Sequence, residues 1–197
     1  MARPVDPVRH EERRLQIVDA ALTCFARDGY GRATTAAICR EAGIGSGTFF
    51  HYFSTKVEVL LAILDLGISQ TAEWFRAQEG RTDPLQVLED YVAHAGQELA
   101  DPRAAGFVRA VGAVMTEPQV ARALERDKGV LSAGLLPWVR AAAGAGQVRT
   151  DVPPERLAAW LQAVLDGYTG VVVPDPHLDG RAEQEMLLDV ARRVLRP

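Results

Sequence analysis

The sequence holds few of the groups from which catalytic or metal centres are built. Its 197 residues include two cysteines and four histidines, and neither set is spaced as metal ligands are. It contains no Gly-rich phosphate loop, no HExxH or CxxC motif and no nucleophile elbow. These absences argue against an enzyme, and we expect no metal and no cofactor.

Long apolar runs are absent as well. No stretch of about 18 apolar residues occurs, so we expect neither a membrane span nor a membrane partner. The first residues are polar and lack the apolar stretch of a secretory signal. Cys24 and Cys39 fall within expected helices, and without a secretory context we interpret them as reduced core residues of a cytoplasmic protein. A redox switch is the less favoured alternative, because free cysteine is usually buried.

The chain does have enough apolar material for a sizeable core. Hydrophobic residues make up 48% of it, which argues against disorder and suits one or two domains. The net charge of −4 is divided unevenly, because residues 1–60 carry 8 basic and 7 acidic groups and the remainder carries 14 and 19. Arg3, Arg9, Arg13 and Arg14 cluster near the N-terminus and can present a positive face to phosphate. A solvated charged face is the plain alternative.

Apolar residues recur at helical spacing along the chain, and no segment of the sequence indicates a β-strand. Leu15, Val18, Leu22 and Phe25 make one such stripe. Pro137 lies inside an expected helix and should kink it, because proline removes the hydrogen bond to the carbonyl one turn earlier. The sequence predicts an all-α fold of about nine helices, the longer ones near residues 9–27, 55–75, 84–99, 102–114, 118–143, 154–171 and 180–195.

Residues 33–56 predict two short helices joined by a tight turn. Thr35 is the expected N-cap of the first helix, and Gly43 lies where the chain must turn. In the second helix, Phe49 and Phe53 are four residues apart and share the inward face. Two short helices joined by a glycine-containing turn are typical of a helix-turn-helix, whose second helix enters the major groove of DNA.

Ordinary helical proteins also contain this geometry, so the spacing alone does not decide between DNA binding and a structural turn. The polar residues outside the inward face favour DNA binding. Thr48, His51 and Tyr52 lie on or beside the outer face, and Lys56 follows in the first turn of the next helix. Hydroxyl and ammonium side chains are usual phosphate contacts, as are helix N-termini.

The same segment resembles the tetracycline-repressor (TetR) family of bacterial transcription regulators. The chain differs from the family pattern at Gly45 and Ser46, where the family often has Ser and then Lys or Arg, and at Phe50, where it often has Tyr. The similarity covers about the first 65 residues and is specific as a set. It rests on Gly29 and Tyr30, Thr34 and Thr35, Ile38, Glu41 to Ile44, Gly47 to Phe49, His51 to Phe53, and Lys56.

The resemblance implies a ligand-responsive transcriptional regulator, most often a repressor. It implies a helix-turn-helix DNA-binding domain at residues 1–56 and an effector-binding and dimerisation domain at residues 57–197. The implied partners are a palindromic operator of double-stranded DNA, a small-molecule effector and a second copy of the chain. The residues we expect at the DNA are Thr34, Thr35, Ser46, Gly47, Thr48, Phe50, His51, Tyr52 and Lys56.

The region from residue 60 to 170 is rich in aromatic residues with interspersed polar groups, as ligand pockets in helical domains are. Plain core is the alternative for each of these residues, because large aromatics dominate cores. The resemblance implies an effector pocket here without identifying its residues. The lining we expect for a largely hydrophobic effector is Leu64, Ile68, Tyr91, His94, Phe107, Met115, Trp138 and Gln162.

The last two expected helices are more apolar than surface helices of a monomer need to be. A second copy of the chain would cover the apolar patch that they expose. We therefore expect a homodimer with a four-helix interface. Its expected residues are Leu161, Val164, Leu165, Tyr168, Met186, Val190 and Val194.

Two other functions stay open. A small-molecule-binding helical protein without DNA function is supported by the differences from the family at Ser46 and Phe50. A helical enzyme built around a central pocket has less support. It would need a titratable group tuned for catalysis in a cleft, with His94 or Asp166 as the first candidates.

Overall fold

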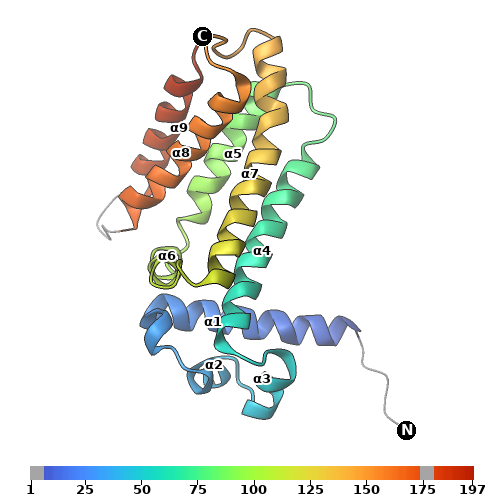
Figure 1. The fold of residues 1–197 in the computed structure, drawn as a ribbon, viewed down its shortest axis with the longest axis vertical. Coiled ribbons are helices and arrows are strands. Elements are labelled where there is room, and N and C mark those ends of the chain that lie inside the picture. Colours follow the sequence, from blue (N-terminus) through green and yellow to red (C-terminus); the bar gives the residue numbers. More distant parts are fainter. Residues whose placement is uncertain (1–6, 174–179) are drawn as a thin grey trace. The chain divides into compact units, whose positions relative to one another are not determined.

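The computed structural model describes residues 7–173 and 180–197, so Arg3 of the basic cluster near the N-terminus lies outside the described part. Within these ranges the chain forms nine α-helices and no strand, which confirms the all-α prediction (Figure 1). None of these helices is long and apolar enough to cross a membrane. The helices are α1 (Pro7–Arg32), α2 (Thr35–Glu41), α3 (Ser46–Tyr52), α4 (Lys56–Ala77), α5 (Pro84–Glu98), α6 (Ala104–Gly112), α7 (Pro118–Gly144), α8 (Pro154–Val172) and α9 (Gly180–Leu195).

The end of α1 is where the longer helices depart most from their expected bounds. Gly29 has φ 75° and ψ 157°, which lie outside the helical region, as expected for a glycine that ends a helix. Helical hydrogen bonding then resumes, and the Ala33 amide donates to the Gly29 carbonyl at 3.1 Å. A short helical segment to Arg32 therefore follows the expected end.

The chain divides into two compact units. Unit 1 comprises Met1–Leu66 and Gly106–Leu124, and unit 2 comprises Gly67–Ala105 and Glu125–Pro197. Each unit has its own hydrophobic core. The functional boundary expected between residues 56 and 57 stays a prediction, because compactness does not report which part contacts DNA.

The core of unit 1 joins α1, α2, α3 and the start of α4. A close approach of α6 to α1 completes it, because any side chain at Gly106 would overlap the carbonyl oxygen of Ala26. The largest fully buried side chains of this core are Phe25, Phe49, Ile17, Ile38, Leu60 and Val59. Each contributes about 2 kcal/mol through burial of apolar surface.

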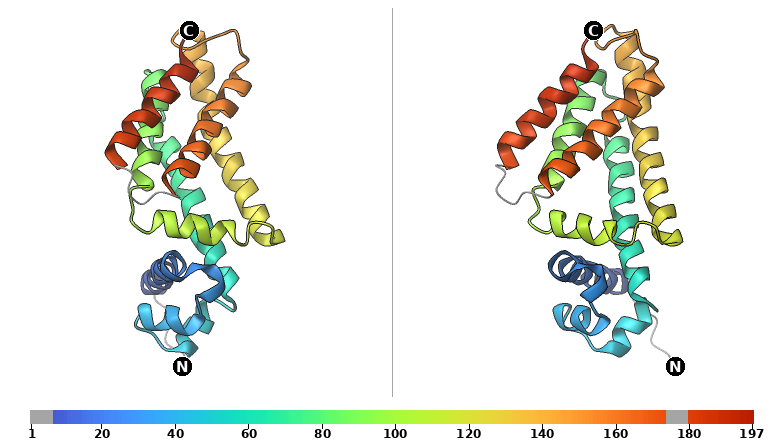
Figure 2. Two further views of the ribbon diagram at one scale, coloured as in Figure 1. Left: turned by 90° about the vertical axis from the view of Figure 1, so that its left-hand side faces the viewer. Right: turned by 60° about the vertical axis from the view of Figure 1, so that its left-hand side comes forward.

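The core of unit 2 is built from the second half of α4 with α5, α7, α8 and α9. Helix α9 packs against both α8 and α5, and the three lie side by side in both views of Figure 2. Helix α7 continues through Pro137, and the kink expected there stays a prediction. At Gly134, one turn before Pro137, the Phe75 ring lies so close that a side chain would overlap the ring.

Candidate functional site

The turn between α2 and α3 is held by backbone geometry that the sequence indicated. Thr34, rather than the expected Thr35, is the N-cap of α2, and its hydroxyl accepts a hydrogen bond from the Ala37 amide at 3.1 Å. Thr35 is instead the first helical residue, because the chain is still extended at Thr34 (φ −114°, ψ 154°). Gly43 takes φ 62°, which a side chain would strain.

Helix α3 separates its side chains into two faces. Phe49 is completely buried and Phe53 nearly so, and the two rings pack 6.2 Å apart between centroids. Phe50 is 55% exposed, although an aromatic ring of this size is normally covered. The other exposed members of the expected DNA set are Thr34, Ser46, Gly47, Thr48 and His51, and Thr35, Tyr52 and Lys56 are half-buried.

Lys56 is bound within its own chain. Its Nζ donates to the carbonyl oxygens of Tyr30 at 2.6 Å and Ala33 at 2.9 Å, and it lies 4.3 Å from the centre of the Tyr30 ring. Burial lowers the pKa of Lys56, whereas the two oxygens and the ring face favour the charged ammonium. The spacing of residues did not reveal this role, since the two carbonyls lie more than 20 positions away.

Helix α1 also takes part in this region, although none of its residues was in the expected DNA set. Gln16 donates from Nε2 to the Ala42 carbonyl at 2.7 Å, which ties α1 to the turn before α3. Arg13 donates to Gln16 Oε1 at 2.8 Å and so shares the same fixed arrangement. Together with Arg9 and Glu12, these two residues line a polar surface groove. The sequence showed only the charges of Arg9, Glu12 and Arg13 and not this arrangement.

An aromatic cluster lies in unit 2, at the end of α4 and along α5. The rings of Trp74 and His94 are nearly parallel at 17°, with centroids 5.7 Å apart. Tyr91 packs 4.5 Å from Phe75 and 5.0 Å from Trp74. Burial raises the pKa of Tyr91 to about 12, although a hydrogen bond with Thr71 acts in the opposite direction and lowers this pKa. The cluster brings together Tyr91 and His94, two of the residues expected at the effector.

The other expected effector residues are divided between the units. Leu64 and Phe107 pack on the core of unit 1, and Met115, in the same unit, is 54% exposed. Ile68 and Gln162 are half-buried residues of unit 2, as is Trp138, which packs against the core of that unit. The full expected lining stays a prediction.

Asp127 is a group of unit 2 that the sequence reasoning missed. Burial raises its pKa, and the carboxylates of Asp166 and Glu98 raise it further. The residue is nevertheless exposed to water over part of its surface. Partial burial and the nearby carboxylates both disfavour the negatively charged form of Asp127.

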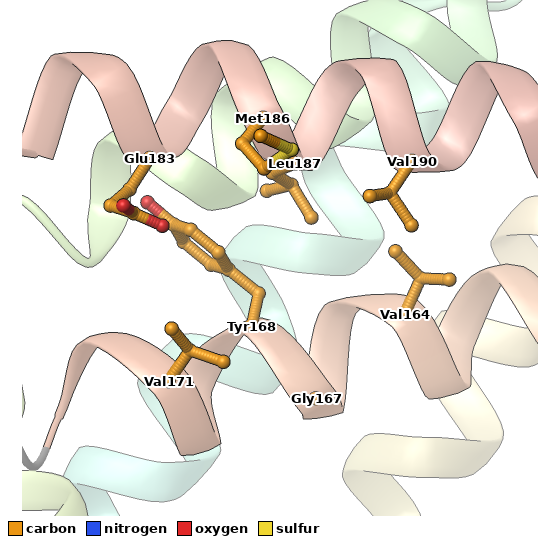
Figure 3. Close-up of a pocket in the computed structure, with 8 residues that line it drawn as sticks. All are labelled: Val164, Gly167, Tyr168, Val171, Glu183, Met186, Leu187 and Val190. Atoms are coloured by element: carbon orange, nitrogen blue, oxygen red, sulfur yellow. The ribbon is translucent and has the colours of Figure 1, made fainter.

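A groove between α8 and α9 carries most of the expected dimer residues (Figure 3). It has a volume of about 360 Å³, and the Tyr168 ring reaches across it towards Glu183. Met186 is 58% exposed and Val171 55% exposed. The lining residues are Val164, Gly167, Tyr168, Val171, Glu183, Met186, Leu187 and Val190.

Three residues of α8 change the expected interface. Leu161 is completely buried and Leu165 is 8% exposed, so both belong to the core of unit 2 and are left out of the interface proposed below. Trp160 was not in the expected set, yet it is 56% exposed on α8. Val194 is half-buried against the same core.

Comparisons with known proteins agree with this helix-turn-helix. A family model described as bacterial regulatory proteins of the tetR family matches residues 17–63. The HTH-type transcriptional repressor AcnR of Corynebacterium diphtheriae is 28% identical over 93% of this chain and 92% of that relative. A TetR transcription regulator from Haloarcula marismortui has a TM-score of 0.81 at 19% identity, covering 94% of this chain and 97% of that one. A SmeT–triclosan complex has a TM-score of 0.80 at 23% identity, covering 94% and 92%.

The matched residues 17–63 contain the N-cap, the glycine turn and the two faces of α3 described above. The similarity to the relative and to the solved structures extends over nearly the whole chain. Residues 17–63 therefore match the tetR family of bacterial regulatory proteins, and the chain is a transcriptional regulator of this type.

Proposed function

We propose that the protein binds double-stranded operator DNA by placing α3 in the major groove. The observation that carries this proposal is the division of α3, in which buried Phe49 anchors the helix while Thr48, Phe50 and His51 stay exposed. Residues of these types can contact phosphates and base edges, and an exposed ring can pack on a thymine methyl group. AcnR of C. diphtheriae is named a repressor, which favours repression here as well.

Selection from random-sequence duplex DNA tests this proposal. The unmodified protein should enrich a sequence with two-fold symmetry, and its affinity should fall steeply with salt because phosphate contacts release counterions. Thr48→Ala should weaken binding to the selected duplex, whereas Thr82→Ala, at an exposed position outside the helices, should not. Enrichment of no sequence would favour a small-molecule-binding protein without DNA function.

A second copy of the chain is the proposed partner at the α8–α9 groove. The exposed apolar side chains of Trp160, Val171, Met186 and Val190 lie on these two helices, and such patches are uncommon on monomers unless they bind something. Two copies related by a two-fold axis would present two α3 helices to half-sites of one operator. A regulator of this kind acts where the chromosome is, so we place it in the cytoplasm.

We further propose that a small, largely hydrophobic effector binds in unit 2 and lowers the affinity for DNA by population shift. Trp74 and His94 are half-buried, so part of each ring is available to a ligand beside buried Tyr91. The SmeT structure of the same fold holds triclosan, an aromatic small molecule. Triclosan is thus a suitable first probe in thermal-shift measurements, with Trp74→Ala as the variant that should lose the response.

A further inference from the structure

The N-terminal turns of α1 pack against the end of α3. The His10 ring lies 4.5 Å from the Tyr52 ring between centroids, at an angle of 35°. One turn further along α1, the Arg14 guanidinium lies 5.8 Å from the centre of the Phe53 ring. Because residues four apart share one face of a helix, His10 and Arg14 hold the last residues of α3 from the same side.

Tyr52 contacts two imidazoles, and the three rings form a triangle. The His51 ring is 5.2 Å from the Tyr52 ring and perpendicular to it, and it is 6.1 Å from the His10 ring. His51 is exposed, while His10 and Tyr52 are half-buried. Imidazole is the side chain whose unperturbed form changes charge between about pH 5 and pH 8.

We infer that His10 is a positioning residue for Tyr52, and that the cluster of His10, His51 and Tyr52 makes DNA binding depend on proton uptake. The inference rests on the proposed function, in which His51 lies at the DNA, and on the sequence prediction that Tyr52 does so as well. A charged His10 attracts the Tyr52 ring face by a cation–π interaction, so protonation strengthens the contact that holds Tyr52.

Charged and titratable groups of both α1 and α3 surround the cluster. Helix α1 contributes the charged groups of Arg9, Glu11, Glu12, Arg13 and Arg14 next to His10, and Glu11 is already paired with Arg14 at 3.2 Å. Helix α3 contributes His51 and Tyr52. Two imidazoles 6.1 Å apart would repel each other if both were charged.

Duplex DNA supplies the missing counter-charge, because it carries one negative charge per about 1.7 Å of its axis. Imidazoles beside those phosphates hold a proton more firmly than they do in the free protein. The complex therefore binds more protons than its separate components, and by linkage the affinity for DNA rises as the pH falls.

The test uses the full chain and a duplex that the unmodified protein selects from random-sequence DNA. Dissociation constants are measured by fluorescence anisotropy at about pH 6 and about pH 8, the range in which imidazole titrates, at one ionic strength. The unmodified protein should bind about tenfold more tightly at the lower pH, as net uptake of about one proton allows.

Two variants of His10 separate positioning from protonation. His10→Phe keeps a ring against Tyr52 but cannot take up a proton. It should bind DNA like the unmodified protein at the higher pH and lose part of the additional affinity at the lower pH. His10→Ala lacks the ring as well, so it should bind several-fold more weakly at both pH values. Lys128→Met, at an exposed position of α7 outside the proposed DNA-binding and effector sites, should keep the full pH dependence.

Each result that contradicts these expectations overturns a different part of the inference. A pH dependence of His10→Phe equal to that of the unmodified protein would overturn proton uptake at His10. Unweakened binding by His10→Ala at the higher pH would overturn the positioning role. Circular dichroism on both variants separates these results from misfolding, and His10→Gln gives a second proton-free variant. If the unmodified protein retains no duplex, the proposed function itself fails.

Discussion

The Nζ of Lys56 lies 2.6 Å from the carbonyl oxygen of Tyr30, so the first residue of α4 is tied to the link between α1 and α2. The same ammonium reaches the Ala33 carbonyl and the face of the Tyr30 ring. A lysine carries three N–H donors, and two are used here. The third remains available to a phosphate oxygen, so the contact inside the chain and the proposed contact with DNA are compatible.

Replacing Lys56 by methionine should therefore reduce stability as well as DNA affinity. Methionine keeps the aliphatic part of the side chain but leaves two carbonyls without their charged donor. Hydrogen bonds to charged groups contribute more than neutral ones, and we expect a loss of about 2 kcal/mol in the free energy of unfolding, measured by urea denaturation. A lysine that served only as a phosphate contact would change the salt dependence of DNA binding and leave stability intact.

Lys128→Met is the matched control for this change. Lys128 is exposed and pairs with Glu125 over 3.4 Å, an arrangement that contributes about 0.5 kcal/mol or less. Equal unfolding free energies for the two variants would show that the bonds from Lys56 to the carbonyls of Tyr30 and Ala33 add nothing to stability.

A second prediction compares two glycines of α7. Gly134→Ala should destabilise the protein by about 1–3 kcal/mol, because the added methyl group overlaps the Phe75 ring and the core must shift. Gly129→Ala places its methyl group in open space and should stabilise by up to about 1 kcal/mol through helix propensity. Thermal unfolding of both variants measures the difference, and a stabilising Gly134→Ala would mean that the space beside Phe75 is open after all.

Local signals in the sequence were sufficient for much of the fold. Prolines at the starts of α5 and α8 gave helix limits close to those observed, whereas the glycine near the end of α1 did not. The inward face of α3 followed from the spacing of Phe49 and Phe53, because two aromatic residues one turn apart must share a face. Such signals act within a few residues and need no knowledge of distant packing.

Contacts between distant parts of the chain were not predictable in the same way. The partners of Lys56 are backbone carbonyls, which every residue has, so no residue type marks them. The buried position of Leu161 and the exposure of Trp160 on the same helix depend on where its neighbours pack. Periodicity shows that α8 has an apolar stripe, but it does not tell core from partner surface when the stripe is wide.

The proposed dimer leads to a third prediction, which uses two methionines of similar exposure. Met186→Glu introduces a charge into the α8–α9 groove, where Met186 is 58% exposed, and should convert the dimer to a monomer. Met115 is 54% exposed but lies outside this groove, so Met115→Glu should stay dimeric. Light scattering gives the mass of each variant. A dimer that survives Met186→Glu, or an unmodified chain that is already monomeric, would rule out this interface.

The last prediction concerns the sign of a pH effect at Asp127. Burial, with Asp166 and Glu98 nearby, raises the pKa of this carboxyl in the folded protein. The folded state therefore binds the proton more tightly than the unfolded chain does, so the contribution of Asp127 to stability is present at low pH and is lost as the pH rises through the raised value.

Asp127→Asn removes that pH-dependent loss. The variant should melt at a higher temperature than the unmodified protein near pH 7, and the difference should vanish below about pH 4, where carboxyls are protonated in both states. Partial exposure of the side chain to water limits the size of the effect. Glu125→Gln, two residues earlier on α7 and exposed, should show no such gain. If Asp127→Asn lowers the melting temperature at pH 7, the carboxylate is stabilising, and a cationic group must face it in the folded protein.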